Sequence, residues 1–146
     1  MNICRRVLLI LYVLICAAQD IRDRRISLCL SCIVGTAGFL LCAFSGRAPG
    51  ELLLAQLPAL LLYLLGRLTG CIGSGDAVVL SVCGFFFSAG GIAVSLLAAV
   101  FLCGAAALLL SFRRIVSGKG LRGKGLPFAA FLALPTVFLA LKGGGL

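Results

Sequence analysis

The chain has 146 residues, of which 62% are hydrophobic and only 12% charged, and its formal net charge is +9. Soluble domains are about half apolar and about a quarter charged, and one core of this size could not bury so much apolar surface. These values exclude an ordinary soluble domain. We predict an all-α integral membrane protein that forms one polytopic domain over residues 1–146.

Six transmembrane helices are predicted from the apolar segments, since a bilayer core takes about 20 residues of helix. The segments are residues 7–18, 28–44, 52–65, 77–112 and 127–141. The fourth segment is too long for one span and is expected to break at residues 88–91, which gives two helices. The first segment, with two arginines before it, is also typical of a cleavable signal peptide. We favour a retained helix because the segments that follow are equally apolar.

The basic residues predict the orientation of this bundle. With six helices both termini lie on one side of the plasma membrane, and the 13 Lys and Arg residues divide into nine on one side and four on the other. The positive-inside rule places the nine in the cytoplasm and both termini outside. Basic loops of this kind meet anionic lipid head groups. Aromatic residues do not interleave with them, so no nucleic-acid partner is expected.

The four acidic residues are Asp20, Asp23, Glu51 and Asp76. Glu51 falls in an external loop, where we expect a solvated charge. Asp20 ends the first predicted helix and Asp76 begins the fourth, so both lie at the cytoplasmic face and can converge. Taken singly, Asp76 could be a helix N-cap and Asp20 one charge of an interfacial loop. Together they suggest a site, because carboxylates at membrane level are costly and tend to mark function.

Two convergent carboxylates can form a hydrolytic dyad. Because close carboxylates do not both ionise easily, the pair shares a proton. The ionised member would activate water, while the protonated member would polarise a scissile carbonyl and later donate to the leaving amine. The helix dipole favours Asp76 as the ionised member, although such a pair titrates as a unit. Gly73 and Gly75 permit unusual backbone angles and the close approach of a peptide strand, or form a simple interhelical turn.

Three sequence stretches resemble the type IV prepilin peptidases. They are DIRDRRIS at residues 20–27, GSGD at 73–76 and KGLPFAAFLAL at 124–134. They occur in the family's order and cover essentially the whole chain. The sequence departs from the family at four positions, where Ser27 and Leu28 replace Pro and Asn, Val78 replaces Lys, and Ala130 replaces Pro. No departure removes a carboxylate.

The resemblance implies a membrane aspartic endopeptidase that cuts the basic leader from pilin-like (Flp-type) precursors at the cytoplasmic face. Asp20 and Asp76 would form the dyad, Gly73 and Gly75 would support the catalytic loop, and no metal or other cofactor is expected. The size is similar to that of the small, peptidase-only members of tight-adherence systems. The expected partners are a prepilin substrate and membrane lipid, and the sequence leaves open a homodimer.

Other interpretations remain open at this point. The departures allow a catalytically degenerate homologue, a membrane scaffold or a transport subunit, although transport would need a polar stripe through the membrane. A presenilin-type protease also uses GxGD, but its first Asp lies deep in a helix rather than at a helix end. Asp23 is a fallback for Asp20. Cys29 and Cys32 have the spacing of a redox or zinc half-site. Because both lie inside a predicted helix, we expect them to behave as small apolar residues instead.

Overall fold

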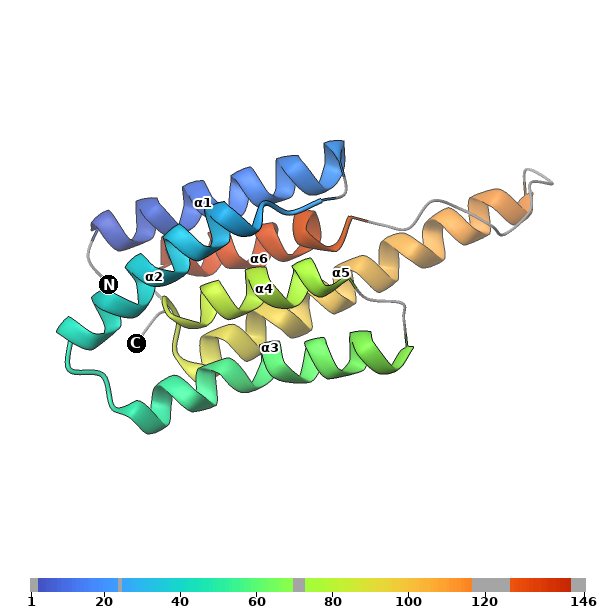
Figure 1. Ribbon diagram of the computed structural model, residues 1–146. Helices are drawn as coiled ribbons and strands as arrows, with labels where there is room; N and C mark the ends of the chain where they lie inside the picture. The colour runs from blue at the N-terminus through green and yellow to red at the C-terminus, as the bar shows by residue number, and fades with distance from the viewer. Residues whose placement is uncertain (1–2, 24, 70–72, 117–126, 143–146) are drawn as a thin grey trace.

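The computed structural model describes residues 3–23, 25–69, 73–116 and 127–142, and this part of the chain is all-helical (Figure 1). It contains six α-helices, as predicted. They are α1 (Ile3–Arg22), α2 (Leu28–Phe44), α3 (Pro49–Thr69), α4 (Ser74–Gly84), α5 (Ala89–Val116) and α6 (Phe128–Lys142).

Two of these helices are long and apolar enough to cross a membrane, through the segments Pro49–Leu68 of α3 and Ala89–Arg113 of α5. Only 17% of each segment is buried inside the protein, so neither is the core helix of a soluble protein. Large side chains such as Leu97, Phe101 and Leu108 face outward. Helices α2, α4 and α6 are apolar but shorter, and α1 carries charges near both ends. The predicted six helices are therefore confirmed, whereas six full spans are not.

The long apolar segment breaks slightly earlier than predicted. Helix α4 ends at Gly84 and α5 begins at Ala89, so the break covers residues 85–88 rather than 88–91. Ser88 explains the difference, because its hydroxyl accepts a hydrogen bond from the Gly91 N–H (3.3 Å) and its carbonyl accepts one from the Ile92 N–H (3.0 Å). These bonds cap the first turn of α5 and draw the two glycines into the helix.

Helix α4 is the central element of the bundle, and it contacts all five other helices. Its buried side chains Val79, Leu80 and Cys83 pack in one core with Leu9 and Tyr12 of α1. The Tyr12 hydroxyl is hydrogen-bonded to Ser31 of α2 (3.0 Å), so the phenol stays paired in an apolar interior. Contacts with five helices thus hold α4 in the bundle, and its N-terminal turn has a fixed place at one end of it.

Gly38 permits the close contact between α2 and the end of α4. A Cβ atom there would lie 2.8 Å from the Phe86 ring, which is closer than side chains normally pack. A Cβ at Gly35 would make ordinary contact with Val82, at 3.4 Å. The absence of a side chain therefore matters more for helix packing at Gly38 than at Gly35.

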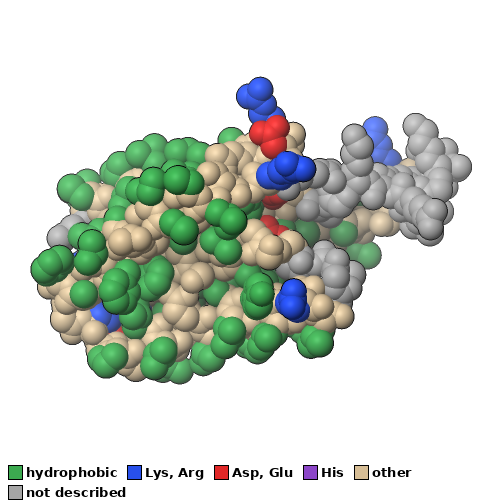
Figure 2. All heavy atoms as spheres, viewed as in Figure 1, with side chains coloured by type: hydrophobic (Ala, Val, Ile, Leu, Met, Phe, Trp, Pro, Cys, Tyr) green, Lys and Arg blue, Asp and Glu red, His purple; other side chains and the backbone are tan. Residues whose placement is uncertain are grey.

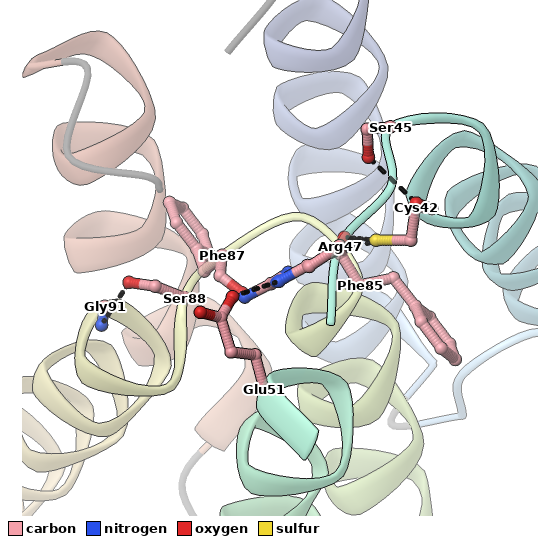
Figure 3. Close-up of polar contacts among 8 residues, drawn as sticks. All are labelled: Cys42, Ser45, Arg47, Glu51, Phe85, Phe87, Ser88 and Gly91. Carbon is pink, nitrogen blue, oxygen red and sulfur yellow. Dashed lines mark hydrogen bonds and ion pairs between the residues drawn. The ribbon is translucent and has the colours of Figure 1, made fainter. Parts of the chain in front are cut away.

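Arg47 joins the connection between α2 and α3 to the connection between α4 and α5 (Figure 3). Both connections lie at the end of the bundle away from the start of α4. Its Nη2 donates to the Phe87 carbonyl (2.6 Å), and its Nε lies 3.6 Å from the Glu51 carboxylate. Only 4% of the Arg47 side chain is exposed, against 63% for Glu51. Glu51 was predicted to be a solvated charge in a loop; it is exposed, but it belongs to the first turn of α3 and forms an ion pair with Arg47.

Candidate active site

A cleft of about 390 Å³ opens where α1 ends and α4 begins. Figure 1 shows that these two helix ends lie at the same end of the bundle. Acidic side chains are visible at this end of the bundle in Figure 2, next to an otherwise largely hydrophobic face. The cleft is lined by Asp20, Arg25, Ile26, Leu28, Gly73, Ser74, Gly75 and Asp76. The structure therefore brings all four sequence-predicted site residues, Asp20, Gly73, Gly75 and Asp76, onto one cleft.

Asp20 lies in the last turn of α1 and is half-buried. Its Oδ2 accepts a hydrogen bond of 2.9 Å from the backbone N–H of Ala129, which lies in the first turn of α6. The N-terminus of a helix carries unpaired N–H groups and a partial positive charge. The first turn of α6 is therefore the part of the bundle that supplies a backbone donor to Asp20.

The hydrogen bond between Ala129 and Asp20 was not predicted from the sequence. Ala129 belongs to the stretch KGLPFAAFLAL, which was noted only for its resemblance, and alanine has no functional group in its side chain. The signal that could have revealed it is Pro127 directly before an apolar helix, since proline favours helix starts. Such a start offers free N–H groups to any anion that the fold brings near.

Asp76 is the third residue of α4 and lies outside both membrane-crossing segments. It is not the N-cap that one reading of the sequence suggested, because Gly73 occupies that position. Burial, and secondly the negative charge of Asp20, raise the pKa of Asp76 to about 6, against an opposing hydrogen bond with the Gly73 backbone. Burial disfavours the charged form of a carboxyl. Burial and Asp20 thus oppose the helix dipole, which was predicted to favour the ionised form of Asp76.

The two glycines act in different ways. Gly73 has φ −69° and ψ 138°, which any residue adopts, so its predicted backbone freedom is not used here. At Gly75 a Cβ atom would lie 3.0 Å from Cδ1 of Ile26. The absence of a side chain at Gly75 thus lets the loop between α1 and α2 lie against the first turn of α4, which forms one wall of the cleft.

Ser27 has a clear structural role although it departs from the family pattern. Its N–H donates to Oε1 of Gln19 (3.1 Å), and its hydroxyl accepts from the Leu30 N–H (3.4 Å) as the N-cap of α2. A serine cap of this kind defines where a helix begins. The connection from α1 to α2 is therefore held in place without a proline. Leu28, the next departure, is the first residue of α2 and is exposed.

Asp23 and the cysteine pair lie apart from the two cleft carboxylates. Asp23 is exposed and lines a neighbouring cleft of about 590 Å³ with Gln19, Arg25, Ile26 and Ser27. Cys29 and Cys32 are exposed, unbridged residues of α2. Helical placement of the pair is as predicted. The basic loop at residues 117–126 lies outside the described residues.

The family model of the type IV leader peptidase family matches residues 7–108, which is more than half of the chain. The matched region includes Asp20, both cleft glycines and Asp76, and it ends before α6. Comparison with curated proteins and with solved structures found no match.

Proposed function

Because this chain belongs to the type IV leader peptidase family, we propose that it is a membrane aspartic endopeptidase with Asp20 and Asp76 as its catalytic dyad. The observation that carries the proposal is the shared cleft, which receives one carboxylate from the end of α1 and one from the start of α4. Family membership supports a peptidase acting on a prepilin-type substrate. The dyad, the substrate's leader and the membrane face are the parts that we add.

In the proposed mechanism the two carboxyls have different protonation states. Asp20 is the anion, since the Ala129 N–H and the N-terminus of α6 stabilise its negative charge. Asp76 holds the shared proton, because burial and the neighbouring charge of Asp20 raise its pKa. The backbone donor at Asp20 and the burial of Asp76 are the reasons for assigning Asp20 as the base and Asp76 as the acid.

Peptide hydrolysis then follows with all protons accounted for. Asp20 takes a proton from a water molecule whose oxygen bonds to the scissile carbonyl carbon, and Asp76 protonates the carbonyl oxygen. In the second step the carbon–nitrogen bond breaks, the amine nitrogen takes the proton from Asp20, and a hydroxyl proton of the intermediate returns to Asp76. Asp20 and Asp76 thus return to their starting protonation states, and each proton transfer passes through one of these two carboxyls.

The proposed substrate is a pilin-like (Flp-type) precursor whose basic leader is removed at the cytoplasmic face of the plasma membrane. The division of nine basic residues against four supports this orientation, since it puts the end of α1 and the start of α4 inside the cell. Ser27 caps the start of α2 and so keeps the connection from α1 in a defined place beside the cleft. This favours an active enzyme over a degenerate homologue.

The test is cleavage of a co-expressed prepilin from the same genome. We compare wild type with Asp20→Asn, Asp76→Asn and the matched control Asp23→Asn at equal membrane levels. The proposal expects leader removal to be lost in the first two variants and kept in the control, because Asp23 lies on the neighbouring cleft. Leader removal that survives both cleft substitutions would exclude the dyad, and an inactive wild type would favour a scaffold.

A further inference from the structure

Helix α4 lies at the floor of an open trough between α2 and α3. Both flanking helices contact α4, but through their described residues they do not contact each other. Hollows of about 520 Å³ and 400 Å³ lie on the two sides of α4, the first against α3 and the second against α2. Val78 and Ser81 line both hollows, so the two form one surface, which we call the α4 trough.

The trough adjoins the cleft that holds the two carboxylates. Gly75 and Asp76 line the cleft, and the next two residues of the same helix, Ala77 and Val78, line the trough. A peptide that crosses the cleft in extended form therefore reaches the trough within about one helical turn of Asp76. Because the two surfaces are continuous, one molecule can occupy both the cleft and the trough.

The chemistry of the trough suits an apolar helix with small polar groups rather than lipid alone. The α3 side of the trough is lined mostly by aliphatic residues, and the α2 side also carries Ser31 and Thr36. Gln56 and Ser81 lie on the trough and are joined by two hydrogen bonds, from Ser81 Oγ to Gln56 Oε1 (2.7 Å) and from Gln56 Nε2 to the Ser81 carbonyl (3.1 Å). An amide has two donors and two acceptor sites, so Gln56 keeps capacity for a polar group of a partner. A lipid tail offers none, and polar groups facing lipid are costly.

We propose that the α4 trough binds the apolar helix of the leader-bearing precursor, and that this docking brings the bond before that helix to Asp20 and Asp76. The inference rests on the proposed function, and it adds the surface that selects the substrate. Binding an amphipathic or apolar helix in a groove between helices is a general recognition mode. Ala77 and Val78 then contact the start of the bound helix, because they are the trough residues closest in sequence to Asp76.

The first experiment is site-specific photo-crosslinking with p-benzoylphenylalanine in the Asp76→Asn background, which keeps a co-expressed pilin-like precursor uncleaved. The probe is placed at Leu57 in the trough or at Val100 on α5; these side chains are 46% and 51% exposed and both lie in membrane-crossing segments. We expect the Leu57 probe to capture the precursor at least tenfold more efficiently than the Val100 probe.

Other outcomes separate this inference from the proposed function. If wild type cleaves the precursor with dependence on Asp20 and Asp76 but the Leu57 probe captures only lipid or a second copy of the chain, the trough assignment is overturned and the peptidase stands. If cleavage does not depend on the two carboxylates, both proposals are overturned.

A second variant tests occupancy by kinetics. Ser81→Phe fills the trough, so we expect at least a tenfold loss in kcat/KM through a higher KM, whereas Val100→Phe should stay within twofold of wild type. Because the trough lies beside the cleft and does not include the dyad, the kcat at saturating precursor should change far less than KM. A Ser81→Phe enzyme with an unchanged KM would refute the trough.

Discussion

Replacing Asp20 by Asn should lower the pKa of Asp76, because the charge of Asp20 is the second largest cause that raises it. The wild-type value of about 6 means that about a tenth of Asp76 is protonated at pH 7 and about nine tenths at pH 5. Burial is the largest cause and is unchanged by the substitution. The pKa in the variant should therefore fall below about 6 and stay above the ordinary value of 3.8.

The assay is ¹³C NMR of the detergent-solubilised protein labelled at the aspartate carboxyl carbon. The sequence has only three aspartates, at positions 20, 23 and 76, so the spectrum contains three carboxyl signals, and Asp76→Asn identifies the one of interest. Asp23→Asn is the matched control, and it should leave the titration of Asp76 unchanged because Asp23 lines the other cleft. A wild-type Asp76 that titrates near 4, or one that ignores Asp20→Asn, would refute the electrostatic reasoning.

Further predictions concern pH and packing. In the proposed mechanism the reaction requires the proton of Asp76, so kcat/KM should fall about tenfold per pH unit above an apparent pKa near 6, and a profile flat to pH 8 would contradict this. The folded state binds more protons than the unfolded state between pH 3.8 and about 6, so stability falls as pH rises through this window; Asp76→Asn should raise the Tm relative to wild type at pH 7.5 but not at pH 3. Arg47→Ala leaves a carbonyl unpaired and should cost about 1–3 kcal/mol in chemical unfolding, whereas Glu51→Gln, at an exposed partner, should cost less than about 1 kcal/mol. Gly38→Ala should cost about 1–3 kcal/mol by overpacking, while Gly90→Ala, where a Cβ meets nothing within 4 Å, should not destabilise by packing; equal losses in both would count against the close contact.

The parts of this fold that follow from the sequence are those set by apolar segments and by the order of the helices. The bounds of α2, Leu28–Phe44, coincide with the predicted segment, because a serine cap marks its start and the apolar run marks its end. The meeting of Asp20 and Asp76 at one end also follows from chain order, since odd and even helices run in opposite directions. Their catalytic roles remain our proposal.

The parts that could not be predicted depend on tertiary contacts. Asp76 was predicted to be the ionised member from its place at a helix N-terminus. Burial and the charge of Asp20 raise its pKa instead, and only the folded chain provides both. Likewise, nothing in the composition of the loop around Arg47 indicates that its guanidinium reaches the carbonyl of Phe87, 40 positions away. The break after α4 also begins three residues earlier than predicted, because an apolar segment does not reveal which of its residues form the turn.

The hydrogen bond from Ala129 to Asp20 has a consequence for biosynthesis. The two residues are 109 positions apart, and a chain is made from its N-terminus onward, so both aspartates enter the membrane before α6 has been synthesised. During that interval Asp20 lacks the backbone donor that the folded chain gives it. In the proposed mechanism the two carboxyls therefore reach their complete surroundings only after α6 has packed against α1.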